Sequence, residues 1–361
     1  MSELKPSGFG RYKIVAELGQ GGMGIVYRAF DPVHEREVAL KILPSTDPIL
    51  LSRFKREFRA LADVDHPNVV KLFELTSDGE TWFFTMEILD GIDLLNYVKF
   101  GIFQSPAEIR DGDARECDAA LHITGEFNLS ELSNERLQRL RHGLAQLVGA
   151  IAALHANGIV HRDIKPSNVI VTPDARIVLL DFGLIAETDA SGSHKSLHQQ
   201  ILGTVAYMSP EQAVCDPVSP ASDWYSVGVM LYQALTGELP FSGNALDVLA
   251  NKRSQDPVSP REIKSSVPQD LNDLCMELLC RRPAGRPGAA DILQRLGEQN
   301  YECAPTKESP PNEFALVGRD SQLRALRDAY QAMLGGQTQV VFVQGRSGDG
   351  KSALAEAFVE Q

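Results

Sequence analysis

The chain has 361 residues, enough for two domains that each bury a hydrophobic core. Hydrophobic residues make up 43% and charged residues 23%, as in ordinary globular proteins, and the formal net charge is −13. So acidic a chain lacks the basic surface of a general nucleic-acid binder, and we expect no nucleic-acid partner.

The N-terminal residues and the cysteines indicate the cellular compartment. Residues 1–13 contain no apolar signal-peptide core, and no run approaches the roughly 18 apolar residues of a membrane span. The 5 cysteines have no CxxC spacing, which favours reduced thiols over a disulfide framework or a zinc site. We therefore expect a cytoplasmic location and no membrane span.

Short β-like runs dominate residues 12–90. They are YKIVAELG, GIVYRAF, EVALKIL, VVKLFEL and TWFFTMEIL, with one helix expected near residues 51–63. From about residue 131 the pattern becomes helical, and leucines and an isoleucine recur at steps of three and four between Leu137 and Leu154. The sequence thus predicts a small β-rich part followed by a larger helical part.

Two segments lack such periodicity. Residues 98–130 are irregular and locally acidic, so we expect an insertion there. Residues 303–313, CAPTKESPPNE, have the composition of a linker. Beyond the linker we expect a helix around Leu326 and Tyr330, and then a buried parallel strand in TQVVFVQG.

A glycine-rich stretch near the N-terminus is a candidate phosphate-binding loop, although a lone GxGxxG is weak evidence. The stretch is followed by Val26 and continues as a strand, whereas a dinucleotide fingerprint opens a helix. A loop between two strands can lie over phosphates with its backbone. Its residues are Leu18, Gly19, Gln20, Gly21, Gly22, Met23 and Gly24.

A charge pair is expected downstream of this loop. Lys41, in VALK, is placed in a strand, where a single lysine more often marks a solvated edge. Glu57 is the only carboxylate between Asp47 and Asp63 in the following helix. Lys41 could bind the α- and β-phosphates of a nucleotide, and Glu57 could orient its ammonium. The two residues would then form a charge pair in which each needs the other.

The densest group of polar residues lies in GIVHRDIKPSNVIV and LLDFGL. Asp163, Lys165 and Asn168 fall within six residues, and Asp181 follows at the end of an apolar strand. Isolated Asp and Asn residues in loops usually form turns. Four such groups flanked by apolar strands are not typical of turns, so the sequence favours a functional cluster.

Together these motifs resemble the eukaryotic-like serine/threonine protein kinase family, including its bacterial members. The resemblance runs from about residue 12 to 290, with the glycine loop, VALK, HRDIKPSN, DFG, GTVAYMSPE, DWYSVG and RRPAGRP in family order. It implies an α+β bilobal kinase fold. The N-lobe would comprise residues 12–90 and the C-lobe residues 91–296, followed by a linker over 297–313.

The resemblance implies a role for each matching residue of the catalytic segment. Asp163 would accept or orient the proton of the substrate hydroxyl, and Lys165 would steady the γ-phosphate of ATP. Asn168 and Asp181 would hold Mg²⁺. Lys165 together with Thr204, in GTVAY, is the serine/threonine pattern rather than the tyrosine pattern.

The segment FTMEIL resembles the hinge of the family and implies an adenine pocket. Met86 would guard the back of this pocket, and the backbones of Glu87 and Leu89 would bond the base. Asp93 would reach the ribose of ATP.

Further matching residues are expected to shape the site rather than to react. Val26 and Ala39 would pack on the adenine, although a plain core role accounts for both as well. Glu211 of SPE, where the family often has APE, should form a buried ion pair with Arg286. Asp223 should tie down the backbone of the catalytic loop.

The implied activity is transfer of the ATP γ-phosphate to Ser and Thr hydroxyls of proteins, including the chain's own. A pseudokinase is the main alternative, but such proteins usually lack one of the catalytic groups, all of which are present here. A small-molecule kinase would generally lack GTVAYMSPE.

We also expect a regulatory phosphate between Asp181 and Glu211 that docks on Arg162; Ser196 fits the family spacing best among Thr188, Ser191, Ser193 and Ser196. Self-association as a route to activation stays open.

A second nucleotide site is indicated near the end of the chain, where GRSGDGKS has the P-loop spacing. With FALVGRDSQLRAL upstream, it resembles the entry of AAA-type or signalling (STAND) ATPases. We expect residues 314–361 to be an incomplete regulatory ATPase domain that binds no nucleotide tightly, because so short a segment cannot build a core. The phosphate-binding residues would be Gly345, Gly350, Lys351 and Ser352.

Overall fold

The computed structural model describes residues 8–21, 24–43, 64–79, 81–101, 132–180, 205–214 and 216–297, with shorter pieces between 51 and 62 and between 325 and 342. Contacts divide the chain into two compact units, Met1–Ala304 and Pro305–Gln361. This division falls inside the segment that the sequence assigns to the linker.

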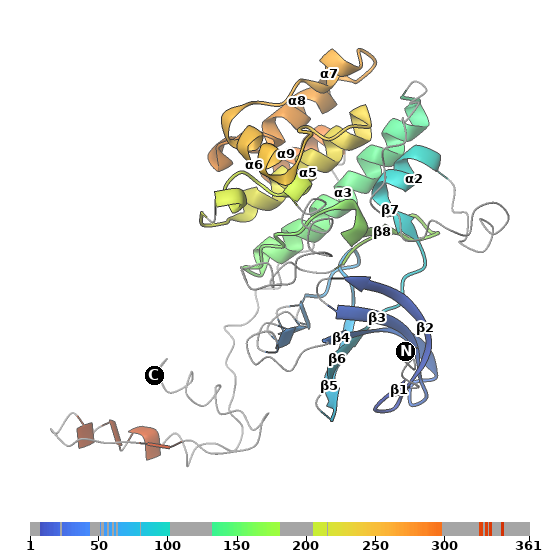
Figure 1. Cartoon of the computed structure of the whole chain (residues 1–361), viewed down its shortest axis with the longest axis vertical. Helices are drawn as coiled ribbons and strands as arrows, with labels where there is room; N and C mark the ends of the chain where they lie inside the picture. The colour runs from blue at the N-terminus through green and yellow to red at the C-terminus, as the bar shows by residue number, and fades with distance from the viewer. Residues whose placement is uncertain are drawn as a thin grey trace. The chain divides into compact units, whose positions relative to one another are not determined.

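The first part of unit Met1–Ala304 is a 6-stranded antiparallel sheet, drawn in blue to cyan in Figure 1. The strands that sequence patterns predict are present, and the described residues between 51 and 62 are helical. The strand order in space is β1 (Gly8–Phe9), β2 (Tyr12–Gly21), β3 (Gly24–Asp31), β4 (Arg36–Leu43), β6 (Thr81–Met86) and β5 (Leu72–Asp78).

Strand β4 separates two hydrophobic clusters because its side chains alternate between the faces of the sheet. Its even-numbered apolar residues pack with Phe83 in one cluster, whereas Ala39 and Leu43 belong to the other. Lys41 shares the parity of Ala39 and Leu43. The alternation therefore directs Lys41 to the face on which the predicted adenine-contacting residues lie.

The rest of this unit is mainly helical, as the sequence predicts, with a small 3-stranded sheet. That sheet has the order β7 (Ile92–Asp93), β8 (Val169–Val171) and β9 (Ile177–Leu179). The helices are α2 (Leu94–Phe100), α3 (Asn134–Ala156), α5 (Pro220–Thr236), α6 (Ala245–Ser254), α7 (Pro260–Ile263), α8 (Gln269–Leu278) and α9 (Ala289–Leu296) (Figure 1).

Helices α3 and α5 form the centre of the helical core. The predicted stripe of α3 is buried from Leu140 to Leu154, and Leu137 packs at its edge. Helix α5 is buried along nearly its whole length. It passes close to α8 at Gly228, where a Cβ would lie 2.8 Å from the Cβ of Leu278. Only glycine permits so close an approach between α5 and α8.

Helix α2 corrects the lower boundary of the irregular insertion. Val98 to Phe100, which the sequence assigns to that insertion, form the last turn of the helix. Tyr97 and Val98 are buried in the helical core, and Gly101 ends the helix with a φ of 62°. Burial of these side chains outweighs the lack of a longer periodic pattern. Residues 102–131 lie outside the described part.

Other expectations concern the cysteines and the membrane. Of the cysteines that the structure describes, Cys275 and Cys280 are both free thiols, and burial raises the pKa of Cys275 far above its ordinary value. Among the described residues, no helix combines the length and the apolar character needed to cross a bilayer.

The described residues of unit Pro305–Gln361 include helical pieces between 325 and 333, where a helix is expected. The buried strand expected in residues 338–345 is not seen at its two described residues. Val341 and Phe342 are 49% and 82% exposed and belong to no strand. A parallel strand is buried only where neighbouring strands and helices cover it, and the described part of this unit provides no such cover.

Candidate active site

The segment from His161 to Asn168 connects α3 to β8 and carries three of the predicted catalytic residues. Asn157 caps the end of helix α3, and Gly158, with a φ of 72°, turns the chain out of the helix. Ile164 is completely buried. An anchored apolar residue between Asp163 and Lys165 holds this loop in one conformation.

Asp223, in the first turn of α5, holds the start of the loop by its backbone. Its two carboxylate oxygens accept hydrogen bonds from the amides of His161 and Arg162, each at 2.8 Å. His155 of α3 also donates to this carboxylate through Nε2 at 2.7 Å. Arg162 has a φ of 71°, a conformation that costs about 1–2 kcal/mol but lets successive amides face one anion. The expected tie between Asp223 and the loop is confirmed.

His161 links this loop to the end of the strand that precedes the DFG motif. Its Nδ1 accepts a hydrogen bond from the amide of Asp163 at 3.2 Å, and its Nε2 donates to the carbonyl of Leu180 at 2.9 Å. An amide can only donate and a carbonyl can only accept, so the proton of the imidazole is on Nε2. His161 is therefore a neutral, fully buried connector, which sequence reasoning did not identify.

The carboxylate of Asp163 is 9% exposed, and its contacts with other described side chains are on one oxygen. Lys165 Nζ lies 2.8 Å from Oδ2, and Asn168 Nδ2 donates to the same oxygen at 3.0 Å. Neither of these two contacts occupies Oδ1, the oxygen that could accept the proton of a hydroxyl. The structure thus brings together the three residues that the sequence places within one motif.

Asn168 is oriented by its amide nitrogen, which also donates to the carbonyl of Asp163 at 2.8 Å. The amide oxygen is then the atom that Asn168 could offer to a metal ion, as its expected role requires. The backbone carbonyl of Asn168 accepts from the amide of Leu180 at 2.8 Å. Leu180 is held at both backbone groups, and this places the chain directly before Asp181 beside the loop.

Lys41 is 2% exposed in the centre of the sheet, so the solvated-edge interpretation of this lysine is wrong. Strand β4 pairs it with Val26 of β3 and with Phe84 of β6, whose ring centroid lies 5.7 Å from Nζ. A buried ammonium requires negative or carbonyl groups around it. This environment fits a lysine that binds nucleotide phosphates.

The residues expected to contact adenine gather in one hydrophobic cluster. Ala39 and Met86 are paired across β4 and β6 and are both buried in this cluster. Val26 and Leu89 pack against it, together with Leu180. An apolar surface beside a buried lysine fits a nucleoside with a polyphosphate, although the same packing also serves as a core.

The hinge residues are held by contacts that restrict what they could offer a base. The amide of Glu87 donates to the carbonyl of Lys71 at 2.9 Å, and its carboxylate binds Arg176 at 2.7 Å. Its carbonyl is therefore the backbone group left for an adenine. Asp93 caps helix α2, since its Oδ1 accepts from the amides of Leu95 and Asn96 at 3.0 and 3.1 Å. Contact with a ribose would have to share this carboxylate.

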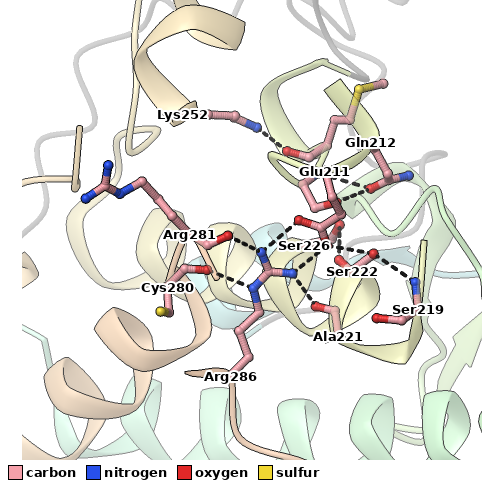
Figure 2. Close-up of polar contacts among 12 residues, drawn as sticks. Glu211, Gln212, Ser219, Ala221, Ser222, Ser226, Lys252, Cys280, Arg281 and Arg286 are labelled. Atoms are coloured by element: carbon pink, nitrogen blue, oxygen red, sulfur yellow. Dashed lines mark hydrogen bonds and ion pairs between the residues drawn. The ribbon is translucent and has the colours of Figure 1, made fainter. Parts of the chain in front are cut away.

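The buried ion pair between Glu211 and Arg286 is present as expected (Figure 2). The guanidinium binds both carboxylate oxygens, at 2.6 and 2.8 Å, and Ser222 donates to the same carboxylate at 2.7 Å. The remaining guanidinium N–H groups donate to three carbonyls, so all five donors are used. These carbonyls belong to Cys280, Ala221 and Arg281, at 2.8, 2.8 and 3.2 Å.

The residues on either side of Glu211 are joined to the catalytic loop through Gln212. Gln212 donates through Nε2 to the carbonyl of Arg162 at 2.9 Å, and its Oε1 accepts from the amide and the hydroxyl of Ser209. The segment 205–214 therefore borders the loop that carries Asp163. A peptide that presents a hydroxyl to Asp163 would have to pass along this border.

One strong contact of this segment was not anticipated from the sequence. Lys252 of α6 is 1% exposed, and its ammonium points to the segment (Figure 2). It donates to the carbonyls of Val205, Ala206 and Met208, at 2.9, 2.6 and 2.6 Å. The available signal is its spacing, four residues after Val248, the other buried residue of α6.

Several predicted site residues lie outside the described part of the chain, and their expected roles stay predictions. They are Gly22, Met23, Glu57, Asp181 and Thr204, the side chain of Gln20, the proposed phosphorylation sites at residues 188–196, and the P-loop residues Gly345, Gly350, Lys351 and Ser352.

Comparison with protein-family models gives two matches. A model described as a protein kinase domain matches residues 12–296. A model described as an AAA ATPase domain matches residues 315–361. The first match covers most of the chain and contains every described residue of the site above.

Curated relatives include bacterial serine/threonine-protein kinases. PrkC of Bacillus subtilis is 32% identical over 289 residues, which cover 79% of this chain and 40% of PrkC. PknA of Mycobacterium tuberculosis is 30% identical over 321 residues, which cover 85% of this chain and 66% of PknA. The chain thus spans well under half of the length of PrkC.

Among solved structures, the kinase domain of Mycobacterium tuberculosis PknI has a similar fold. It superposes with a TM-score of 0.54 over 82% of this chain and 99% of that domain, at 22% sequence identity. The likeness supports the bilobal arrangement of sheet and helices.

Proposed function

Since the chain belongs to the protein kinase family, we propose that it transfers the γ-phosphate of ATP to serine and threonine hydroxyls of proteins, its own included. The observation that carries this proposal is the arrangement around Asp163. Its Oδ2 is held by Lys165 and Asn168, and its Oδ1 is left for a substrate hydroxyl. A module that only senses nucleotide would have no need for this arrangement.

The described residues, together with the predicted metal ligand Asp181, would account for the chemistry as follows. The hydroxyl oxygen of the substrate attacks the γ-phosphorus of ATP, and the bond to the bridging oxygen of ADP breaks. The hydroxyl proton passes to Asp163, and Lys165, beside it, donates to the phosphoryl oxygens as negative charge develops on them. Asn168, with Asp181, would hold Mg²⁺, which neutralises phosphate charge when bound. Lys41 positions the phosphates from the sheet.

Incubation of the purified chain with radiolabelled ATP, Mg²⁺ and a mixture of serine- and threonine-containing peptides tests this function. We expect label on phosphoserine and phosphothreonine and none on phosphotyrosine. A chain that binds ATP but transfers no phosphate to any peptide or to itself would instead support the pseudokinase alternative.

Lys41→Met is expected to lower the rate of phosphate transfer by on the order of 10²-fold, the usual loss on removing one preorganised charge that faces a reacting phosphate. Methionine preserves the length and apolar stem of the side chain, so the sheet should stay intact. Lys13→Met, which removes an exposed lysine from β2 of the same sheet, is the matched control and should leave the rate unchanged. Equal rates for both variants would contradict the role of Lys41.

We further propose that activity requires a phosphate on the loop between Asp181 and Glu211. The backbone of Arg162 is fixed by Asp223 and Gln212, which places a cation of the catalytic loop where a nearby phosphate could bind. Peptide mapping of active protein should find a phosphorylated serine or threonine there, and Ser196 is the preferred site. Full activity of protein that carries no phosphate in this segment would refute the proposal.

The AAA ATPase match supports a second proposal for the C-terminal unit. Within a complete ATPase domain, the backbone amides between Gly345 and Gly350, with Lys351, would bind the phosphates of another nucleotide, and Ser352 would bind its metal ion. Such a site would be independent of the kinase site, because the two lie in separate compact units.

A further inference from the structure

Four successive backbone carbonyls of residues 205–208 are bound by two buried side chains. The ammonium of Lys252 takes three of these carbonyls, at 2.6 to 2.9 Å. The hydroxyl of Ser226, in α5, takes the fourth, that of Tyr207, at 2.8 Å. Residues 205–207 form a helical turn, whose last carbonyls have no partner within the turn itself. The two side chains supply those partners.

We propose that Lys252 is a positioning residue that holds residues 205–208 in the conformation that receives the protein substrate. This inference rests on the proposed kinase function, and it concerns binding of the peptide rather than binding of ATP. The segment 205–214 borders the catalytic loop through the bond from Gln212 to Arg162. Backbone shifts at residues 205–208 would therefore move the surface next to Asp163 on which the substrate chain lies.

The cost of keeping this lysine argues that the contact has a use. Lys252 is 1% exposed, and burial lowers the pKa of its ammonium to about 7. Carbonyl oxygens oppose this effect because they stabilise the charged form. Methionine would fill the same space without desolvating a charge. A neutral side chain, however, could not donate three hydrogen bonds to one turn.

Other residues around Lys252 cannot replace it. The ring centroid of Tyr225 lies 5.4 Å from Nζ of Lys252. Arg286 lies against the same ring, but its guanidinium is already bonded to Glu211. The ion pair of Glu211 and Arg286 anchors the segment at residue 211. Lys252 anchors it further towards its start, directly after Thr204 in the sequence.

The test is steady-state kinetics of the full chain with a synthetic serine or threonine peptide that the wild-type protein phosphorylates. Lys252→Met should raise KM for the peptide by about tenfold or more, as expected on losing charge-assisted hydrogen bonds. KM for ATP should stay within about twofold, since the sheet is unchanged. Arg253→Met, an exposed neighbour on α6, is the control and should change neither constant.

A second variant covers the case in which Lys252→Met does not fold. Ser226→Ala removes the fourth carbonyl bond with a minimal change of volume. It should raise KM for the peptide by about threefold, in line with a neutral hydrogen bond. An unchanged peptide KM in a folded Lys252→Met protein overturns the proposal. If Lys252→Met is insoluble, an unchanged peptide KM in Ser226→Ala overturns it as well. A variant in which both KM values rise and kcat falls by the same factor also overturns the proposal, because the effect is then not confined to peptide binding.

Hydrogen–deuterium exchange separates this inference from the proposed function. Amides of residues 205–214 should exchange faster in Lys252→Met (or in Ser226→Ala, if the first variant is insoluble), while those of α5 and of the sheet keep their wild-type rates. If the wild-type chain phosphorylates no peptide, the kinase proposal fails, and the exchange data still decide whether Lys252 holds the segment. Identical exchange in both proteins overturns the role of Lys252 whatever the activity.

Discussion

Asp163→Asn is expected to lower the rate of phosphate transfer by about 10³- to 10⁴-fold, at the upper end of what a general base contributes. Asparagine has nearly the same shape, and its amide oxygen can still accept from Lys165 and Asn168. It cannot accept the proton of a substrate hydroxyl. The loop should keep its conformation, because its amides are held by Asp223 and not by the side chain of residue 163.

Single-turnover assays with radiolabelled ATP measure this loss, and ATP titration of the same protein should give an unchanged dissociation constant. Asp65→Asn is the matched control, since Asp65 is exposed and carries no role in the site. A rate within about tenfold of wild type in Asp163→Asn would show that another group, or none, takes the proton.

Arg286→Met is expected to lower the free energy of unfolding of the kinase unit by about 3–5 kcal/mol, because it leaves a carboxylate buried without its partner. The change also removes the donors of three buried carbonyls. In a unit of this size such a loss should lower Tm by on the order of 10 °C. Thermal unfolding followed by circular dichroism measures it.

The pH dependence of stability distinguishes this mechanism from a simple packing defect. Burial alone raises the pKa of Glu211, but hydrogen bonds from Arg286 and Ser222 outweigh it and hold the pKa below its ordinary 4.5. In the wild type, the pair therefore stabilises the fold above about pH 4.5, and this contribution is lost as the pH falls through the pKa of the folded state.

In Arg286→Met the sign reverses. Burial then dominates, the pKa of Glu211 rises above its value in the unfolded chain, and the folded state binds more protons. The variant should become more stable on acidification from pH 7 to about pH 5. The double variant Glu211→Gln, Arg286→Met should recover part of the lost stability and lose this pH dependence. A single variant whose Tm does not rise between pH 7 and about pH 5 would contradict the explanation.

Contacts within and between the sequence motifs were predictable from the sequence. The pairing of Glu211 with Arg286 and the tie from Asp223 to the loop were implied by the resemblance to the kinase family, whose motifs contain the residues involved. The β runs and the stripe of α3 follow from periodicity. The motifs do not predict an additional structural role of a residue that they already assign to the site. Asp93 was assigned to a ribose, whereas its carboxylate caps α2, a use that the following Asn96 amide makes possible.

Lys252 shows a different limit. A lysine beside Arg253 on a helix is usually a solvated charge, and only the spacing of Lys252 from Val248 distinguishes the two in the local sequence. Its partners are carbonyls some 44 to 47 residues away, and backbone carbonyls are contributed by every residue type. The residue types at the acceptor positions therefore do not predict such a contact. The start of the insertion was misplaced for a related reason, because burial of Val98 depends on the distant α3.

The carboxylate of Asp223 has a consequence for how the protein would report on its own unfolding. The amide protons of His161 and Arg162 are bonded to a side chain of α5 that is completely buried. Solvent can reach them only when α5 separates from the loop, an opening that disrupts the helical core. These two amides should therefore be among the most slowly exchanging protons of any loop in the chain, and their rates would measure cooperative opening of the helical part directly.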